Sequence, residues 1–238
     1  KVDAVNDIIQ DLRKHAPDYV SAMIDSYEML MSSYMNLAEF DVTNIQKRSI
    51  KGLSFKQYKL DLDSCLSLGR RGKKTTAFTM PAIITKTPPI RPDAQYGQGK
   101  EDPIGAERVL SFEPTFDLTP TGLHRPKIVI CIGSKGGRFK QLVKGEDDLR
   151  QDAIMQQVFG TVNDLLRQEG WSGTDCRNNS IGNSTGLVHR LRLITYGITP
   201  LSPTSGVLEW VDNTMCFGDF LSDKSRKVGA HSKYYPGG

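Results

Sequence analysis

The sequence predicts an α+β protein, in which a helical-repeat segment precedes an antiparallel β-sheet that carries one main helix. Two observations support this order. Apolar residues recur at helical spacing near the start of the chain, and short β-branched runs bounded by glycine appear from Glu107 onward. One further long helical pattern interrupts the strands after Asp147. The predicted order is therefore helices, strands, one helix and strands again.

The first two elements are helices. Residues 2–14 form an amphipathic pattern, and a second stripe of tyrosine, methionine and leucine runs from Tyr19 to Leu37 after Pro17. Two consecutive helices joined at a proline indicate an antiparallel pair from a helical array. We expect the second stripe to pack against neighbouring helices, with a partner-binding groove as the alternative. The apolar face of the first helix consists of Val2, Val5, Ile8, Ile9 and Leu12.

The middle of the chain indicates a domain boundary. Residues 41–62 carry weak helical or irregular signals, and the basic run Gly69–Lys74 is expected to be a solvated loop, with a localisation signal or a phosphate-binding patch as alternatives. Residues 85–106 are rich in proline and glycine, which is typical of a linker. We therefore predict helices over 1–62, a linker with the first elements of the sheet over 63–106, and the sheet domain over 107–238.

Strands begin after residue 107. Two short runs lead into Lys127–Ile132, a β-branched run typical of a central strand, and Gly133–Gly137 predicts a tight hairpin before the returning strand Arg138–Lys144. A helix is expected over about Asp148–Gln168. Its predicted buried face consists of Leu149, Ile154, Met155, Val158 and Phe159.

The end of the chain combines loops with further strands. Residues 169–187 are polar and rich in glycine and asparagine, so we interpret them as a surface insertion. Strands are predicted at Leu187–Thr195 and near Gly206–Val211. Lys1 falls inside a helical pattern, and Gly238 follows no stop signal, so we expect a piece of a longer chain.

Composition excludes several classes of protein. Thirty-one basic residues against 27 acidic ones give a net charge of +4, which is too even to indicate a nucleic-acid surface. No apolar run is long enough to span a membrane, and no secretory signal opens the chain. The four cysteines contain no C-x-x-C pair, which argues against a zinc site or a disulfide framework and favours a reduced intracellular compartment.

One lysine stands out as a candidate binding residue. Lys144 ends an apolar strand, and Asp147 and Asp152 follow three and eight residues later at a helix start. A lysine fixed by a carboxylate can hold an anionic phosphate. The Gly133–Gly137 hairpin before it offers free backbone N–H groups and no bulky side chains. The alternative is a surface lysine beside an acidic turn that only stabilises its helix.

Catalytic and metal signatures are missing from the sequence. His189-Arg190-Leu191 lacks the aspartate of a kinase catalytic loop, and Phe217–Phe220 holds the letters of a D-F-G triplet in the wrong order. We find no carboxylate set for magnesium and no general base in a catalytic-loop motif. We therefore expect neither catalytic residues nor metal ligands in this segment.

Four stretches carry a family resemblance. LVKGEDDLRQDAIMQQVF, PKIVICIGSKGG, PLSPTSGVLEWV and GAHSKYYP occur at residues 142–159, 126–137, 200–211 and 229–236. Together they resemble the phosphatidylinositol 3-kinase-related protein kinases, in particular the ATM-type branch, with insertions of a fungal kind. The likeness covers about residues 123–236 and implies a kinase small lobe, or N-lobe. Residues 1–62 resemble the end of the FAT helical region that precedes that lobe.

The resemblance implies roles for individual residues. Lys144 would bind the nucleotide phosphates, with Asp147 and Asp152 positioning it. The phosphate loop would consist of Ser134, Lys135 and Gly136. The adenine site would be formed by Leu142, Tyr196, Leu208, Glu209, Trp210 and Val211, in which Glu209 and Val211 supply hinge backbone groups and Trp210 an indole surface.

The resemblance also implies a function. It predicts a Ser/Thr protein kinase that uses ATP and Mg²⁺ and phosphorylates Ser or Thr followed by Gln, in the nucleus, in DNA double-strand break and telomere signalling. Implied partners are protein substrates, a break-sensor complex and a second copy bound through helical regions, without membrane. The catalytic base and metal ligands would lie in a large lobe beyond this segment, so this stretch alone would be inactive. A phosphatidylinositol lipid kinase and a non-catalytic scaffold with a nucleotide-binding lobe are the alternatives.

Overall fold

The computed structural model describes nine stretches of the chain: residues 2–15, 18–46, 50–62, 109–120, 124–133, 136–169, 192–215, 217–222 and 229–235. Several sequence predictions lie outside them. These are the basic run Gly69–Lys74, the linker, nearly all of the 169–187 insertion, and two residues of the predicted phosphate loop, Ser134 and Lys135.

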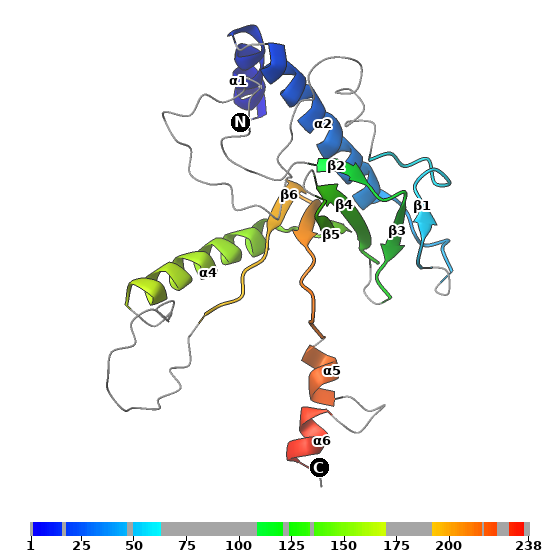
Figure 1. Cartoon of the computed structure of the whole chain (residues 1–238), viewed down its shortest axis with the longest axis vertical. Helices are drawn as coiled ribbons and strands as arrows, with labels where there is room; N and C mark the ends of the chain where they lie inside the picture. The colour runs from blue at the N-terminus through cyan, green and yellow to red at the C-terminus, as the bar shows by residue number, and fades with distance from the viewer. Residues whose placement is uncertain are drawn as a thin grey trace.

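The two predicted N-terminal helices are present. Helix α1 spans Val2–His15 and α2 spans Asp18–Glu39, and they lie together at one end of the molecule (Figure 1). The Arg13 guanidinium joins them, with one nitrogen 2.7 Å from a carboxylate oxygen of Asp25 and 2.9 Å from one of Glu28. Most of the predicted apolar face of α1 is exposed, including Val5 and Ile8.

The strands of the nine described stretches form one antiparallel sheet of seven strands, in the order β1-β3-β4-β5-β7-β6, with β2 paired to β4. The central hairpin is the predicted one. The strand bounds are β1 Leu53–Ser54, β2 Val109–Phe112, β3 Thr115–Leu118, β4 Lys127–Gly133, β5 Arg138–Gly145, β6 Ile198–Ser202 and β7 Ser205–Glu209.

One predicted strand, Leu187–Thr195, is absent from its described residues, and residues 187–191 lie outside the described stretches. The described part of Leu187–Thr195, residues 192–195, has no regular structure, and the strand of this region is β6 instead. The reason is the pairing of β6 with β7 through a two-residue turn at Pro203 and Thr204, which fixes Ile198 opposite Leu208. The predicted strand near Gly206–Val211 corresponds to β7.

Helix α2 covers one face of the sheet. Its buried residues share a core with the odd-numbered positions of β4, β5 and β7, because side chains alternate between the two faces along a strand. The packed residues are Leu30, Tyr34, Leu37, Ala38, Phe112, Phe116, Val129, Cys131, Val143 and Val207. Residues on both sides of the predicted boundary at 62/63 therefore contribute to one core, and the division into domains stays a prediction.

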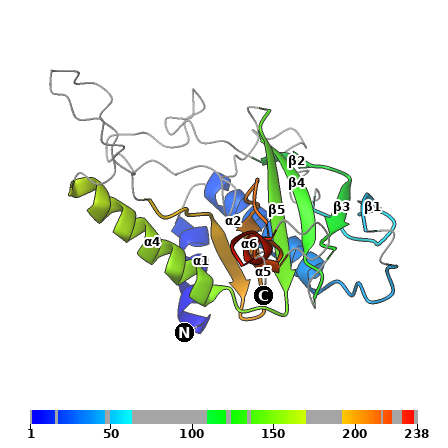
Figure 2. The same cartoon turned by 90° about the horizontal axis from the view of Figure 1, so that it is seen from below.

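The main helix, α4 (Arg150–Gln168), lies along the β6 edge of the sheet (Figure 2). The prediction that it buries a whole apolar face is wrong. Leu149 is fully buried and Phe159 half-buried, but Ile154, Met155 and Val158 are exposed. The described residues cover α4 along the β6 edge alone, so the other apolar side chains have no neighbours there.

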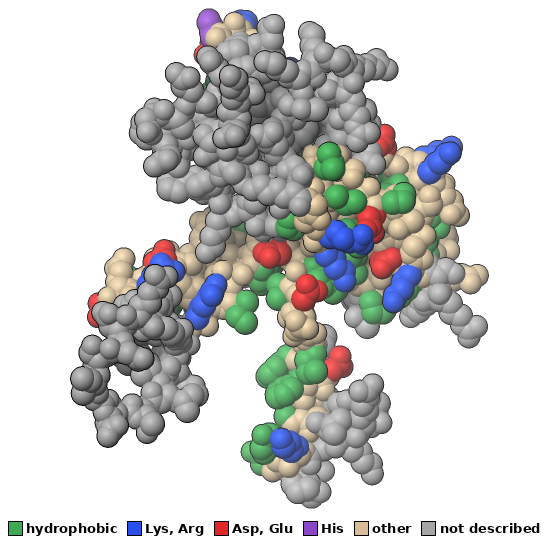
Figure 3. All heavy atoms as spheres, in the orientation of Figure 1, with side chains coloured by type: hydrophobic (Ala, Val, Ile, Leu, Met, Phe, Trp, Pro, Cys, Tyr) green, Lys and Arg blue, Asp and Glu red, His purple; other side chains and the backbone are tan. Residues whose placement is uncertain are grey.

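Two short helices end the described chain. Helices α5 (Phe217–Ser222) and α6 (Ala230–Tyr234) pack on each other away from the sheet (Figure 1). No helix in the nine described stretches has the length and apolar character to cross a membrane. In the view of Figure 3, basic and acidic side chains are interspersed over the described surface of the sheet region.

Candidate functional site

Lys144 lies at the end of β5, on the face of the sheet opposite α2. Its Nζ is 3.0 Å from Oδ2 of Asp147, three residues further on. The backbone N–H of Asp147 donates to the carbonyl of Thr204 at 3.1 Å, which fixes the acidic turn to the β6–β7 turn. Both side chains of the ion pair are partly exposed, so it adds at most about 1 kcal/mol to stability. Its consequence is orientation, because it holds the ammonium at the open face.

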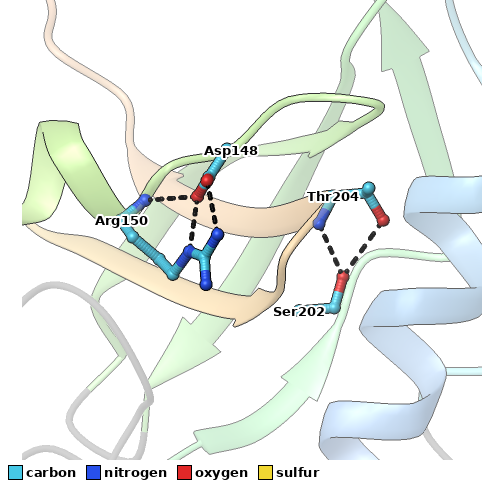
Figure 4. A network of polar contacts seen from close by, with 4 residues as sticks. All are labelled: Asp148, Arg150, Ser202 and Thr204. Carbon is cyan, nitrogen blue, oxygen red and sulfur yellow. Dashed lines mark hydrogen bonds and ion pairs between the residues drawn. The ribbon is translucent and has the colours of Figure 1, made fainter.

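The turn between β5 and α4 is built to place these groups. Glu146 adopts a φ of 58°, a left-handed conformation that reverses the chain after Gly145. Asp148 accepts two hydrogen bonds from the Arg150 guanidinium, at 2.8 and 2.6 Å, and one from the Arg150 backbone N–H (Figure 4). These bonds hold the pKa of Asp148 at about 2, well below its usual value. The carboxylate of Asp148 thus lies just before the first turn of α4, where negative charge interacts favourably with the helix dipole.

Gly206 allows the start of α4 to approach the sheet. It pairs with Lys144 across β5 and β7, and a Cβ at this position would lie 2.7 Å from Leu149 Cδ1 and 2.7 Å from the Thr199 carbonyl oxygen. Leu149 fills that space and is fully buried. Neither role was predicted from the sequence, where Gly206 reads only as part of a strand.

An apolar row lies next to Lys144 on the face of the sheet opposite α2, and two of its members, Ile128 and Leu208, are buried. Leu142 pairs with Leu208, and the same register places Ile128 and Ile198 at its two ends. Trp210 follows at the end of β7, and its ring centroid lies 3.9 Å from the Nζ of Lys140. The sheet thus brings together Leu142, Leu208 and Trp210, three of the residues predicted to contact adenine. A flat heteroaromatic ring suits such a surface.

The segment after β7 keeps one backbone donor available. The Glu209 N–H donates to the Gly197 carbonyl at 2.8 Å, and the Trp210 N–H to the Lys140 carbonyl at 3.1 Å. The Val211 N–H has no acceptor among the described residues. The Glu209 carboxylate accepts from the Gly197 N–H at 2.9 Å, so both the backbone N–H and the side chain of Glu209 bond to Gly197.

Side-chain amides of α4 hold the segment that leads to β6. Gln156 Oε1 accepts from the backbone N–H of Tyr196 at 3.1 Å. Asn163 makes a reciprocal pair with Leu193, donating to its carbonyl at 2.9 Å and accepting from its N–H at 2.8 Å. Tyr196 is thereby tied to α4, next to β6. No local pattern indicates these bonds, because each joins residues at least 30 positions apart.

The structure separates two of the predicted groups from Lys144. Gly136 turns the β4–β5 hairpin with a φ of 82°, at the opposite end of β5. The extended strand from Gly137 to Lys144 spans roughly 23 Å at about 3.3 Å per residue. Asp152 is exposed in the first turn of α4, and the carboxylate that contacts Lys144 is that of Asp147.

The described residues between β3 and β4 include His124–Pro126, which lie at the Lys144 end of β5. Lys127 at the start of β4 pairs with Val143, the neighbour of Lys144. In the same connection, Nδ1 of His124 is 2.5 Å from Oε2 of Glu146 in the acidic turn. The antiparallel register of β4 and β5 brings His124 to this end of β5.

The described residues hold no group of three or more histidine, cysteine, aspartate or glutamate side chains that could bind a metal ion. Together they form a half-site: one ammonium for an anion, an apolar row for a flat ring, and one outward backbone donor.

Comparisons with known proteins point to one group of kinases. Residues 138–236 match the family model of phosphatidylinositol 3- and 4-kinase. Serine/threonine-protein kinase ATM of Arabidopsis thaliana is 32% identical over 232 residues, and serine-protein kinase ATM of Sus scrofa is 34% identical over 236 residues. These alignments cover 97% and 99% of this chain but only 5% and 6% of the relatives.

A fungal relative and a solved structure agree with this match. Serine/threonine-protein kinase tel1 of Schizosaccharomyces pombe is 40% identical over 129 residues, which is 54% of this chain and 4% of that protein. The solved structure of the FAT and kinase domain of CtTel1 superposes with a TM-score of 0.66 at 26% identity, covering 98% of this chain and 14% of that one. The resemblance to the phosphatidylinositol 3-kinase-related kinases predicted from the sequence is therefore confirmed, and it extends to ATM and Tel1 protein kinases over nearly the whole chain.

Proposed function

We propose that this chain is the nucleotide-binding part of a longer Ser/Thr protein kinase of the ATM and Tel1 type. The whole protein would transfer the γ-phosphate of ATP to Ser or Thr followed by Gln, in the nucleus, in DNA double-strand break and telomere signalling. The observation that carries the proposal is the Lys144–Asp147 ion pair, 3.0 Å long, on the face of the sheet opposite α2 and beside the Leu142–Leu208 row.

In this proposal, different residues bind the phosphates and the adenine of the nucleotide. Lys144 would hold the phosphate oxygens by charge, while Asp147 keeps the ammonium in place between nucleotides. Leu142, Leu208 and Trp210 would bury the adenine ring, with Tyr196 behind it. The carbonyl of Glu209 and the N–H of Val211 would bond the adenine edge.

The register of the strands also indicates which loop could cover the phosphates. Because Gly136 lies at the far end of β5, the β3–β4 connection with His124 is the better candidate to lie over the phosphates. Asp152, exposed at the start of α4, is proposed to act on Lys144 only when a nucleotide rearranges the turn. Magnesium would neutralise charge on the phosphates, and we place its ligands and the catalytic base in a large lobe beyond this chain.

The relatives support two further proposals, one about the helical segment and one about the partners. We propose that residues 1–62 are the last FAT helices and that residues 107–238 are the small lobe. A second solved structure similar to this chain is the complete CtTel1 dimer with C2 symmetry, which supports a homodimer of the whole protein here as well. Recruitment by a double-strand break sensor complex belongs to the same proposal.

The test replaces Lys144 with Met in the full-length protein and measures phosphorylation of a Ser-Gln peptide. Lys51→Met, an exposed lysine before β1, is the matched control. Loss of activity in Lys144→Met alone supports the proposal. Wild-type activity in Lys144→Met refutes it. Phosphatidylinositol offered as a second substrate tests the lipid-kinase alternative, and the names of the relatives lead us to expect no transfer to it.

A further inference from the structure

Among the described helices, α2 is the one that packs against β5, the strand that carries Lys144. Along β5, Gln141, Val143 and Gly145 are buried against α2, while Leu142 and Lys144 point to the open face. Helix α2 contacts β5 and β7, the two strands of the candidate nucleotide site (Figure 2). Anything that moves α2 relative to β5 therefore moves the backbone from which Lys144 projects.

Two contacts fix α2 to β5 on either side of Lys144. The Tyr34 hydroxyl donates to Oε1 of Gln141 at 2.5 Å, and both side chains are 0% exposed. One turn further along the helix, the backbone of Ala38 presses on Gly145: a Cβ added to Gly145 would lie 2.3 Å from the Ala38 carbonyl oxygen. These contacts flank Lys144, at three residues before it and one residue after it.

A third contact joins the same carbonyl to the neighbouring strand. Lys127 on β4 is 3% exposed, and its Nζ donates to the Ala38 carbonyl at 2.6 Å. Lys127 pairs with Val143 across β4 and β5. The C-terminal end of α2 thus contacts both strands next to Lys144. A shift of α2 relative to the sheet would break the Lys127 bond or change the close approach of Ala38 to Gly145.

We infer that Tyr34 and the last turn of α2 act as positioning elements for the phosphate-binding lysine. This inference rests on the proposed function. The position of Lys144 relative to the bound phosphates would be determined by Tyr34, Gln141, Gly145 and the Ala38 carbonyl. A displacement of the helical segment would then change ATP affinity without any contact between α2 and the nucleotide. Tyr34 and Gln141 are positioning residues and touch no substrate.

The experiment uses the full-length kinase with Tyr34→Phe and Gly145→Ala. Tyr34→Phe removes one hydrogen bond, and Gly145→Ala forces α2 and β5 apart. Gly160→Ala on α4 is the matched control, because a Cβ there meets no atom within 4 Å. The readouts are the KM for ATP, the KM for the peptide, kcat, and the dissociation constant for ATP.

We expect both variants to raise the KM and the dissociation constant for ATP by about tenfold, with the KM for the peptide unchanged and Gly160→Ala at wild-type values. A merely structural role would instead lower the active fraction, so that kcat falls while the KM for ATP stays constant, and that result overturns the inference. If Gly145→Ala fails to fold, Tyr34→Phe decides alone. If Lys144→Met is inactive while Tyr34→Phe and Gly145→Ala keep wild-type ATP affinity, only this inference is refuted. If Lys144→Met is active, the proposed function itself is refuted.

Discussion

The buried hydrogen bond between Tyr34 and Gln141 gives the sharpest prediction about stability. Gln141 is an amide in the core, and its Nε2 has no hydrogen-bond partner among the described residues. Tyr34→Phe leaves Oε1 without its donor as well. An unsatisfied buried polar group costs about 1–3 kcal/mol, so the local free energy of opening of β5 should fall by about that amount.

Hydrogen exchange measured by mass spectrometry reads this change directly. A loss of about 1–3 kcal/mol corresponds to about 5- to 150-fold faster exchange of the β5 amides, where exchange reports local opening. The double variant Tyr34→Phe/Gln141→Leu is the control, because replacing both partners with apolar groups of similar shape is nearly neutral. It should return the exchange of residues 138–145 close to that of the wild type.

Two outcomes would refute the reasoning. Unchanged exchange of β5 in Tyr34→Phe would mean that the bond does not hold α2 to the sheet. Faster exchange in the double variant than in Tyr34→Phe would mean that Gln141 stabilises the core through contacts other than the tyrosine.

The remaining predictions concern pH and packing. Burial lowers the pKa of Lys127 from its ordinary 10.5 to about 8. Between these pH values the unfolded chain binds one more proton than the folded chain, so the free energy of unfolding should rise with pH across this window. Lys127→Met should flatten this rise, measured as the unfolding midpoint at several pH values. A midpoint difference between the two chains that is independent of pH would contradict this. Gly206→Ala should lower the stability by about 1–3 kcal/mol, because the new methyl group meets the backbone of β6 at 2.7 Å. Hydrogen exchange of the β6 and β7 amides measures this loss, with Gly160→Ala as the control. Equal exchange in the two variants would disprove the close approach.

The sequence predicted the helices and the central hairpin, because their signals lie within short stretches of the chain. The spacing of apolar residues predicts α1, α2 and α4, and glycine with β-branched residues predicts the β4–β5 hairpin. The position of β6 was missed because it depends on pairing with β7 across a turn. The period of α4 predicts that Ile154, Met155 and Val158 share a face, but it carries no information on what covers that face.

The candidate site divides in the same way. Lys144 followed by Asp147 is a spacing of three residues within one turn, so their contact could be expected from the sequence. The distance between Lys144 and Gly136 could not, because it depends on the direction of β5: the hairpin that precedes a strand lies at the end opposite its last residue. His124 comes close to Glu146, and Gly206 to Lys144, only through the antiparallel register. Tyr34 meets Gln141 on β5 only through the packing of α2.

The central claim is that Lys144 holds the phosphates of ATP, and a lysine-reactive ATP tests it most directly. An ATP analogue with an acyl group on its terminal phosphate transfers that group to an amine that lies against the phosphates, and mass spectrometry of the full-length protein identifies the labelled lysine. We predict acylation of Lys144, suppressed by an excess of unmodified ATP, with no such protection at the exposed Lys51. Labelling of another lysine in an ATP-protected manner, with Lys144 unmodified, would contradict the account.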